Sequence, residues 1–236
     1  MAASYSSINV YNTTIADIVT ALTAKSLITA NLYQSATILI FTSPISTKYI
    51  KFVVSSGGIV MSYGDGQSGS NLTGTIVTIN GYYSTPLMSG VHMVCDTNFF
   101  CIITETTGGS QGNFIYYGVT DSGKEITFGL YGDSSYYRYT TNVCKNITDG
   151  TTMYPVVWST HFNDGGQEMT QGLMWRDASS GQILKNGVNP AITVGVKNVS
   201  MRFNYTLKAS NYIVYLAPSY ITTFGGILTA VLVDFS

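Results

Sequence analysis

The chain has 236 residues, of which only 10% are Asp, Glu, Lys or Arg, and its formal net charge is -1. An ordinary soluble domain carries roughly 25% charged residues, so Ser, Thr, Asn, Gly and Tyr must form most of the surface. This charge balance excludes the basic footprint of a nucleic-acid-binding protein. Near-zero net charge favours association, which suggests a permanent member of an assembly rather than a free enzyme.

The apolar stretches are too short to cross a membrane as helices. The longest runs, ATILIF at 36–41 and GILTAVLV at 226–233, fall far below the roughly 20 residues that a spanning helix needs. They are rich in β-branched residues and bounded by polar turns, which favours buried strands. Residues 1–10 contain neither a basic region nor an apolar run, so we expect no secretory signal and a protein made in a cytoplasm.

The first predicted element is a helix within residues 12–33. Thr14 and Asp17 are spaced as in a capping arrangement at its start. The apolar stripe of this helix, at helical spacing, consists of Ile15, Ile18, Val19 and Leu22. The stripe is explained by packing of the helix on a sheet, and no other segment shows a convincing helical period.

Short β-branched runs separated by Gly- and Ser-rich turns fill the rest of the chain. We predict strands at 36–43, 49–56, 58–64, 74–80, 90–96, 98–106, 113–120, 124–132, 153–162, 172–184, 191–207, 211–218 and 225–235. Turns are predicted at 96–98, 121–123 and 177–181. The pattern predicts a mainly β (α+β) fold of antiparallel, sandwich-like sheets with one N-terminal amphipathic helix. We expect a single domain over residues 1–236, with a soft division near the polar residues 145–170.

The stretch FFCIITETTGGSQGNFIYYG, residues 99–118, consists of two apolar runs joined by a Gly-rich turn. It contains one acid, Glu105, and no basic residue that would assist it in catalysis. We therefore interpret it as a hairpin that packs and docks rather than as the wall of an active site.

Two patterns raise the question of a cofactor or metal. GDGQSG places Gly64, Gly66 and Gly69 in a formal G-x-G-x-x-G, but a strand follows instead of the helix whose N-terminus would bind phosphate. We interpret it as a turn and expect no cofactor. His92 precedes Cys95 by three residues, an offset that points the two side chains to opposite faces of a strand. With His161 the only other histidine, we expect no metal site.

The chain has three cysteines, Cys95, Cys101 and Cys144, an odd number that does not suggest a disulfide framework. Cys95 and Cys101 flank DTNFF and could approach one another across a hairpin. Two buried, reduced thiols are the expected alternative in a reducing cytoplasm.

The acids show no recognisable catalytic pairing. Glycoside hydrolysis needs two carboxyl groups placed across a sugar. The candidates are Glu105, Asp121, Glu125, Asp133, Asp164 and Glu168. Most lie beside Gly or Ser, so turn hydrogen bonding and solubility are their expected roles. No G-x-S-x-G elbow is present, and we predict that the protein is not an enzyme.

Tyrosines cluster in or next to predicted turns, in GYYS, IYYG and SSYYRY. Exposed Tyr is favoured at protein interfaces because its ring has an apolar face and a hydroxyl tip. The candidate interface residues are Tyr82, Tyr83, Tyr116, Tyr117, Tyr136, Tyr137 and Tyr139. Packing in the core at strand ends is the alternative for the same residues.

Several segments together resemble a group of tailed-bacteriophage virion proteins. IADIVTAL matches the short N-terminal helix of that group, and YIKFVVSSGGIVMSYG matches a strand pair with a glycine-rich turn. VHMVCDTNFFCIITET matches a central strand, aspartate turn and strand. NFIYYGVTDSGKE, RDASSGQIL and YIVYLAPSYITTFGGILTAVLV match later hairpins. The group's tryptophan-glycine after the helix is replaced here by ANLYQS.

The resemblance implies a structural component of a virion, in the tail or baseplate, with no catalytic residues. Its partners would be other virion proteins and copies of itself, and it would assemble in the host cytoplasm. The alternative function is a receptor- or glycan-binding module at the tail tip or on the capsid. Its sugar site would use Trp158, Trp175 and the SSYYRY loop at 134–139. A polysaccharide-degrading enzyme is a third hypothesis.

Overall fold

The computed structural model describes most of the N-terminal two thirds of the chain and the strands of the remainder. The described residues are 4–8, 13–28, 30–56, 58–79, 87–106, 112–120, 122–131, 144–155, 169–172, 174–177, 180, 183–185, 192–198, 206–209, 212–218 and 227–234. Apart from Ser180, side chains are described only up to residue 152. All strand pairs in these residues are antiparallel, and they contain one α-helix. The predicted mainly β fold is therefore confirmed.

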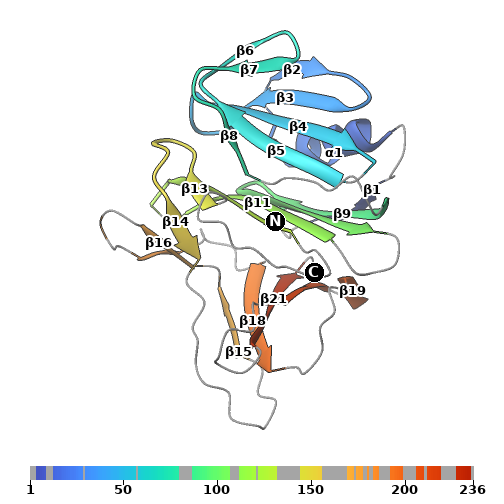
Figure 1. Cartoon of the computed structure of the whole chain (residues 1–236), viewed down its shortest axis with the longest axis vertical. Coiled ribbons are helices and arrows are strands. Elements are labelled where there is room, and N and C mark those ends of the chain that lie inside the picture. The colour runs from blue at the N-terminus through green and yellow to red at the C-terminus, as the bar shows by residue number, and fades with distance from the viewer. Residues whose placement is uncertain are drawn as a thin grey trace.

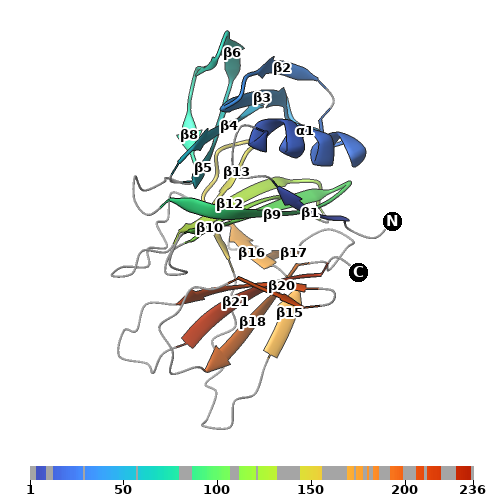
Figure 2. The same cartoon turned by 90° about the vertical axis from the view of Figure 1, so that its right-hand side faces the viewer.

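The sheets are arranged in layers (Figures 1 and 2). The upper sheet has the order β2 (Asn31–Gln34), β3 (Ile38–Thr42), β4 (Tyr49–Ser55), β5 (Gly58–Gly64), β8 (Val77–Thr78). The middle sheet has the order β1 (Ser4–Ile8), β9 (Met88–Asp96), β10 (Phe99–Thr106), β11 (Gly112–Val119), β12 (Glu125–Tyr131), β13 (Cys144–Asn146). A two-stranded hairpin, β6 (Gly66–Ser68) and β7 (Asn71–Thr73), projects from the upper sheet.

The C-terminal strands form two further sheets below the middle sheet (Figure 2). One has the order β15 (Met169–Gly172), β18 (Ile192–Asn198), β21 (Ile227–Asp234), β20 (Tyr212–Pro218), β19 (Thr206–Ala209). The other has the order β14 (Met153–Pro155), β16 (Met174–Asp177), β17 (Ile183–Lys185), and its β16–β17 pair confirms the hairpin predicted at 177–181. Sheet membership changes between β13 and β14, inside the soft division expected near 145–170.

The single helix, α1 (Thr14–Ala24), lies between the upper and middle sheets (Figure 2). Its predicted stripe is confirmed, because Ile15, Ile18 and Leu22 are buried and Val19 packs at the edge of the core. The capping prediction was wrong by one residue. Thr13 is the N-cap, and its hydroxyl donates to Oδ2 of Asp17 at 3.2 Å instead of capping a backbone N–H.

The helix is also shorter than the segment 12–33 suggested. It ends at Ala24, and Ser26 then adopts a left-handed backbone with φ of 59°. This conformation is unfavourable inside an α-helix of L-residues, so the chain leaves the helix and continues into β2. Residues Asn31–Gln34 instead form β2, the edge strand of the upper sheet.

A row of aromatic rings joins the upper and middle sheets. Phe41 and Phe52 of the upper sheet lie 5.7 Å apart between ring centroids. Phe52 meets Phe100 of the middle sheet edge-on at 5.6 Å, and Phe100 stacks on Tyr117 at 5.0 Å. All four rings are completely buried. Burial of a phenylalanine-sized side chain stabilises a fold by about 1.5–3 kcal/mol, so this row is a principal contact between the layers.

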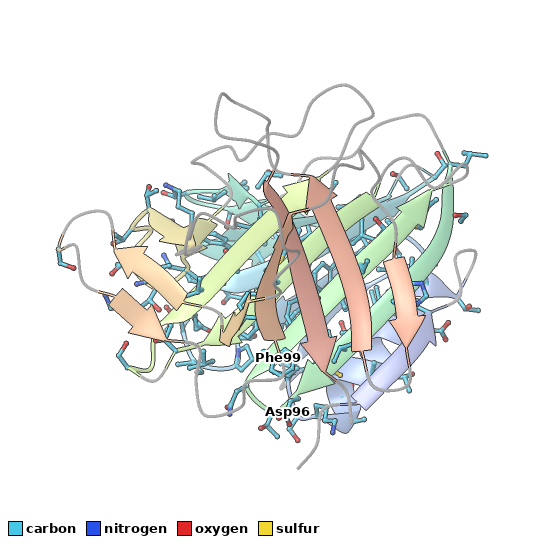
Figure 3. All side chains as sticks on the ribbon, turned by 90° about the horizontal axis from the view of Figure 1, so that it is seen from below. Asp96 and Phe99 are labelled. Atoms are coloured by element: carbon cyan, nitrogen blue, oxygen red, sulfur yellow. The ribbon has the colours of Figure 1, made fainter. Side chains whose placement is uncertain are left out.

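The middle sheet is buried on both faces. One face carries Phe100, Ile102 and Tyr117 toward the upper sheet, while Phe99, Cys101 and Tyr116 point to the other face and are equally buried. The C-terminal sheet lies across that second face (Figures 2 and 3). Burial on both sides explains why the run FFCII lacks the polar alternation of a half-exposed strand.

The predicted hairpin over residues 99–118 is confirmed, with Phe99 paired to Gly118. The preceding turn is also confirmed: Asp96 pairs with Phe99, and Thr97 and Asn98 form the turn between them (Figure 3). Oδ1 of Asp96 accepts the backbone N–H of Thr97 at 2.7 Å. The sequence analysis missed β1, whose residues Ser4–Ile8 pair with β9.

No helix in the described part of the chain is long and apolar enough to span a membrane.

Candidate functional site

A buried polar cluster joins the upper and middle sheets. Glu125 begins β12 and is completely buried. Its Oε1 accepts a hydrogen bond from the Tyr117 hydroxyl at 2.5 Å and another from the Ser43 hydroxyl. Ser43 follows β3 in the upper sheet, whereas Tyr117 and Glu125 belong to the middle sheet. The cluster therefore links two layers whose other described contacts are largely apolar.

The local strand register explains how the middle sheet positions two of these side chains. Glu125 is paired with Val119, and Tyr117 lies two residues before Val119 on β11. Residues two apart on a strand point to the same face, so Tyr117 and Glu125 both face the upper sheet. The parallel ring of Phe100 supports Tyr117 from the neighbouring strand.

The environment of the cluster is strongly desolvated. Burial raises the pKa of Tyr117 well above its ordinary value, and the electrostatic influence and hydrogen bond of Glu125 raise this pKa further. The phenol therefore stays protonated and acts as a donor. Oε2 of Glu125 is buried and has no hydrogen-bond partner among the described residues. Leaving a buried polar atom unpaired costs free energy, so the cluster is a polar feature retained at a cost inside an apolar core.

Ser43 also organises the loop that follows β3. Its Oγ accepts the backbone N–H of Ser46 at 3.2 Å and the Ser46 hydroxyl at 3.1 Å. Its backbone N–H donates to the carbonyl of Lys48 at 2.8 Å. One buried hydroxyl thus connects the shape of the 43–48 loop to Glu125 in the middle sheet.

The geometry of the cluster supports a structural role rather than a catalytic one. A serine nucleophile is activated by an adjacent general base that reaches its hydroxyl, and a reacting group must be accessible to substrate. Ser43, Tyr117 and Glu125 are all buried. The expectation that the acids serve turns and solubility is consequently wrong for Glu125, because the fold places this residue between two sheets. A sequence signal existed: Glu125 and Thr127 alternate with Ile126 and occupy one face of a predicted strand.

The remaining candidate acids form no described pairing. The backbone of Glu105 lies in β10, but its side chain is outside the described residues. Asp121, Asp133, Asp164 and Glu168 also lie outside them, as do the side chain of Trp175, residue Trp158 and the loop at 134–139.

Two of the seven candidate interface tyrosines are described, and they are core residues. Tyr116 and Tyr117 are completely buried on opposite faces of β11. Tyr116 stacks on Phe99 with ring centroids 6.4 Å apart. Their burial favours core packing, the alternative role considered for them. Tyr82, Tyr83, Tyr136, Tyr137 and Tyr139 lie outside the described residues, so a surface role for them stays a prediction.

The glycine pattern at 64–69 belongs to a strand and a hairpin. Gly64 ends β5, Gly66 begins β6, and Gly69 lies in the β6–β7 turn with φ of 56°. A hairpin rather than a helix follows Gly64, as expected, but the interpretation of the whole segment as a turn was wrong, because Gly66–Ser68 form strand β6 and the turn begins only at Gly69. Oδ2 of Asp65 accepts the backbone N–H of Thr75 at 2.7 Å, which closes the base of the hairpin.

Strands β9 and β10 contain Cys95, Cys101 and His92, so the structure tests the predictions made for these residues. Cys95 and Cys101 are buried, neither forms a disulfide, and their pairing partners place them on opposite faces of the middle sheet. Burial raises the pKa of Cys101. His92 and Cys95 also point to opposite faces, as predicted. The described residues contain no group of three or more His, Cys, Asp or Glu suited to hold a metal ion. His161 and the Cys144 side chain lie outside them.

Comparison with known proteins adds no assignment. No protein-family model matches the chain, and no curated protein matches it significantly.

Proposed function

We propose that this chain is a structural subunit of a bacteriophage virion, located in the tail or baseplate. The observation that carries the proposal is the set of segments that resemble such proteins, which extends from IADIVTAL near the N-terminus to ILTAVLV near the C-terminus. The activity is mechanical: a layered β domain presents fixed surfaces to neighbouring subunits.

The described architecture is consistent with this role. The middle sheet is buried on both faces, and aromatic rings and the Ser43–Glu125–Tyr117 cluster join it to the upper sheet. The buried carboxyl group contributes to layer packing rather than to an accessible reaction site. Near-zero net charge and few charged residues also suit a protein that stays bound to its neighbours.

The glycan-binding alternative depends on Trp158, Trp175 and the 134–139 loop. These side chains lie outside the described residues, so no described contact favours that alternative over the structural role.

The proposal can be tested by deleting the coding sequence from the phage genome that carries it. Electron microscopy of the resulting particles is expected to show absent or malformed tails, and expression of the chain in trans should restore them. Normal particles of normal infectivity would contradict an essential structural role. Normal particles that fail to adsorb would favour the receptor-binding alternative instead.

A further inference from the structure

Burial excludes an outside substrate from the Ser43–Glu125–Tyr117 cluster, but it does not exclude a reaction between side chains of the cluster itself. The exposed fractions are 3% for Ser43 and 0% for both Glu125 and Tyr117. The Ser43 hydroxyl contacts the carboxyl group of Glu125 directly. An alcohol and a carboxyl group held together away from solvent are the two reactants of an ester.

The fold brings these two groups together from distant parts of the chain. Ser43 and Glu125 are 82 residues apart in sequence. Ser43 follows β3 and is fixed by the hydrogen bond from its backbone N–H to the carbonyl of Lys48 at 2.8 Å. Glu125 is paired with Val119, and its carbonyl accepts the backbone N–H of Ile147 at 2.8 Å. Groups held in reactive contact within one molecule react at effective concentrations of about 10⁵ M or more.

The hydrogen bonds of the carboxyl group distinguish its two oxygens. Oε1 accepts the hydroxyls of Tyr117 and Ser43, whereas the buried Oε2 has no hydrogen-bond partner among the described residues. In that part of the chain no ion pair involves Glu125, and an ionised carboxylate buried without a cationic partner is costly. Conversion of the carboxyl group into a neutral ester removes the unpaired oxygen and any charge.

We propose that Ser43 and Glu125 form an intramolecular ester, which makes this pair a site of self-catalysed covalent modification. Ser43 Oγ attacks Cδ of Glu125, and the Oγ–Cδ bond forms. The Cδ–Oε2 bond breaks, and Oε2 leaves as water with the proton of the Ser43 hydroxyl and the proton of the carboxylic acid. An ionised carboxylate first takes up that second proton from solvent. The reaction needs no oxidant, reductant or further reactant.

Tyr117 assists the reaction by stabilising the negative charge that develops on Oε1. Its hydroxyl lies 2.5 Å from that oxygen and remains a proton donor, because burial raises the pKa of Tyr117. Loss of one such donor slows acyl transfer in enzymes about 10²–10³-fold. Ser43 rather than Tyr117 is the nucleophile, because an alkyl ester resists hydrolysis better than a phenyl ester.

The ester joins the upper and middle sheets covalently. Ser43 lies just after β3 and Glu125 begins β12, so the bond closes a long loop of the chain. By analogy with a disulfide, a cross-link that closes a long loop stabilises the fold mainly by restricting the unfolded chain. It also holds the two layers together under mechanical load. This suits the structural role proposed above, but formation of the ester does not depend on that role.

Mass spectrometry of the purified, denatured chain tests for the ester. We expect a mass lower than that of the sequence by one water molecule. Trypsin cleaves after lysine and arginine, so the digest should contain peptides 26–48 and 125–138 joined to one another. Mild alkali or hydroxylamine should separate the two peptides, because both treatments cleave esters under conditions that spare peptide bonds. A chain kept unfolded in urea should have the full sequence mass and lose water only after refolding.

Three variants identify the roles of the side chains. Ser43→Ala should retain its full calculated mass after refolding. Ser46→Ala is the matched control and should lose water as the unmodified chain does, since the Ser46 hydroxyl donates to Ser43 Oγ rather than to the carboxyl group. Tyr117→Phe should lose water about 10²–10³ times more slowly during refolding. Urea unfolding verifies that each variant is folded.

Three results would overturn the inference. The unmodified chain could keep its full mass after refolding and storage, or Ser43→Ala could lose water as readily as the unmodified chain. Peptides 26–48 and 125–138 could also be recovered separately from a chain that has lost water, which would place the loss elsewhere. The joined peptides are sought in the unmodified chain, so the test remains decisive if Ser43→Ala fails to fold.

Discussion

The Tyr117 hydroxyl donates a 2.5 Å hydrogen bond to Oε1 of Glu125, and both side chains are completely buried. With Ser43 this pair forms a buried side-chain link between the upper and middle sheets. It connects the core to the 43–48 loop, which presents the exposed Ile45. The stability of the layers and the shape of the 43–48 loop therefore depend on the same few atoms.

Tyr117→Phe should destabilise the protein by about 1–3 kcal/mol, because it removes one of the hydrogen bonds to a buried carboxyl group. Urea unfolding with the midpoint and slope fitted separately measures this change. Tyr33→Phe is the matched control, since Tyr33 is only partly buried and lies on the edge strand β2. Equal losses for the two variants would show that the Tyr117 hydroxyl has no special role.

A double-mutant cycle can test whether the cluster acts as a unit. Ser43→Ala and Tyr117→Phe each remove one donor to the same Oε1 atom. Residues that share a partner are expected to show coupling energies of about 0.5–3 kcal/mol. Strictly additive losses of unfolding free energy would mean that the two hydroxyls bind Glu125 independently.

Gly118→Ala should destabilise the middle sheet by about 3 kcal/mol, near the upper end of typical overpacking costs. A Cβ atom at Gly118 would lie 1.8 Å from the Tyr116 hydroxyl oxygen, and Tyr116 is buried against Phe99. Gly69→Ala is the comparison, since nothing lies within 4 Å of its added Cβ and only its φ of 56° is unfavourable. Thermal unfolding that places Gly118→Ala above Gly69→Ala in stability would contradict the described packing.

The Lys48–Asp65 ion pair predicts a dependence of stability on pH. The hydrogen bond from Lys48 lowers the pKa of Asp65 below 3.8, with further lowering by the Thr75 N–H. A group with a lowered folded-state pKa stabilises the protein above its unfolded pKa, and this contribution is lost as the pH falls through the folded value. Asp65→Asn should therefore be slightly less stable than the unmodified chain at pH 7.

The Asp65→Asn difference should shrink as the pH falls below about 3.8 and also when salt is added, because the pair is exposed. Parallel urea titrations at neutral and acidic pH measure this change. A difference that stays constant across this pH range would show that the ionised carboxylate is not the stabilising species.

Cys95 and Cys101 should react with a thiol reagent only after unfolding, because both are buried and neither forms a disulfide. The elevated pKa of Cys101 lowers its thiolate fraction further. A Cys144→Ser background removes the third thiol from the measurement. Mass spectrometry after alkylation should find neither cysteine modified in the native protein and both modified in urea. Rapid native alkylation of either would contradict the described burial.

Strand positions could be predicted where local sequence and tertiary packing agree. The β-branched runs of β3, β4, β5 and β10 correspond closely to the observed strands. The turn between Asp96 and Phe99 could also be predicted, because its polar residues separate two apolar runs. In these segments, the residues that determine the strands and the residues that determine the turn lie close together in the sequence.

Some missed features, such as β1 and the role of Glu125, depend on partners distant in sequence. The segment SYSSI contains a single strongly apolar residue, Ile8, and becomes β1 only by pairing with β9. Likewise, Glu125 resembles a surface acid until β12 is placed beneath the upper sheet, more than 80 residues from its partner Ser43 along the chain. Neither local propensity nor a sequence motif records such long-range pairings.

The central claim, that this chain is a structural component of a virion, is tested most directly by its copy number in purified particles. Phage particles would be banded by density, washed at high salt and analysed by quantitative mass spectrometry with labelled peptides of this chain. The account predicts a fixed number of copies per particle, in a simple ratio to the major tail proteins, that survives the wash. Absence from infectious particles, or a trace amount that varies between preparations and washes away, would contradict it.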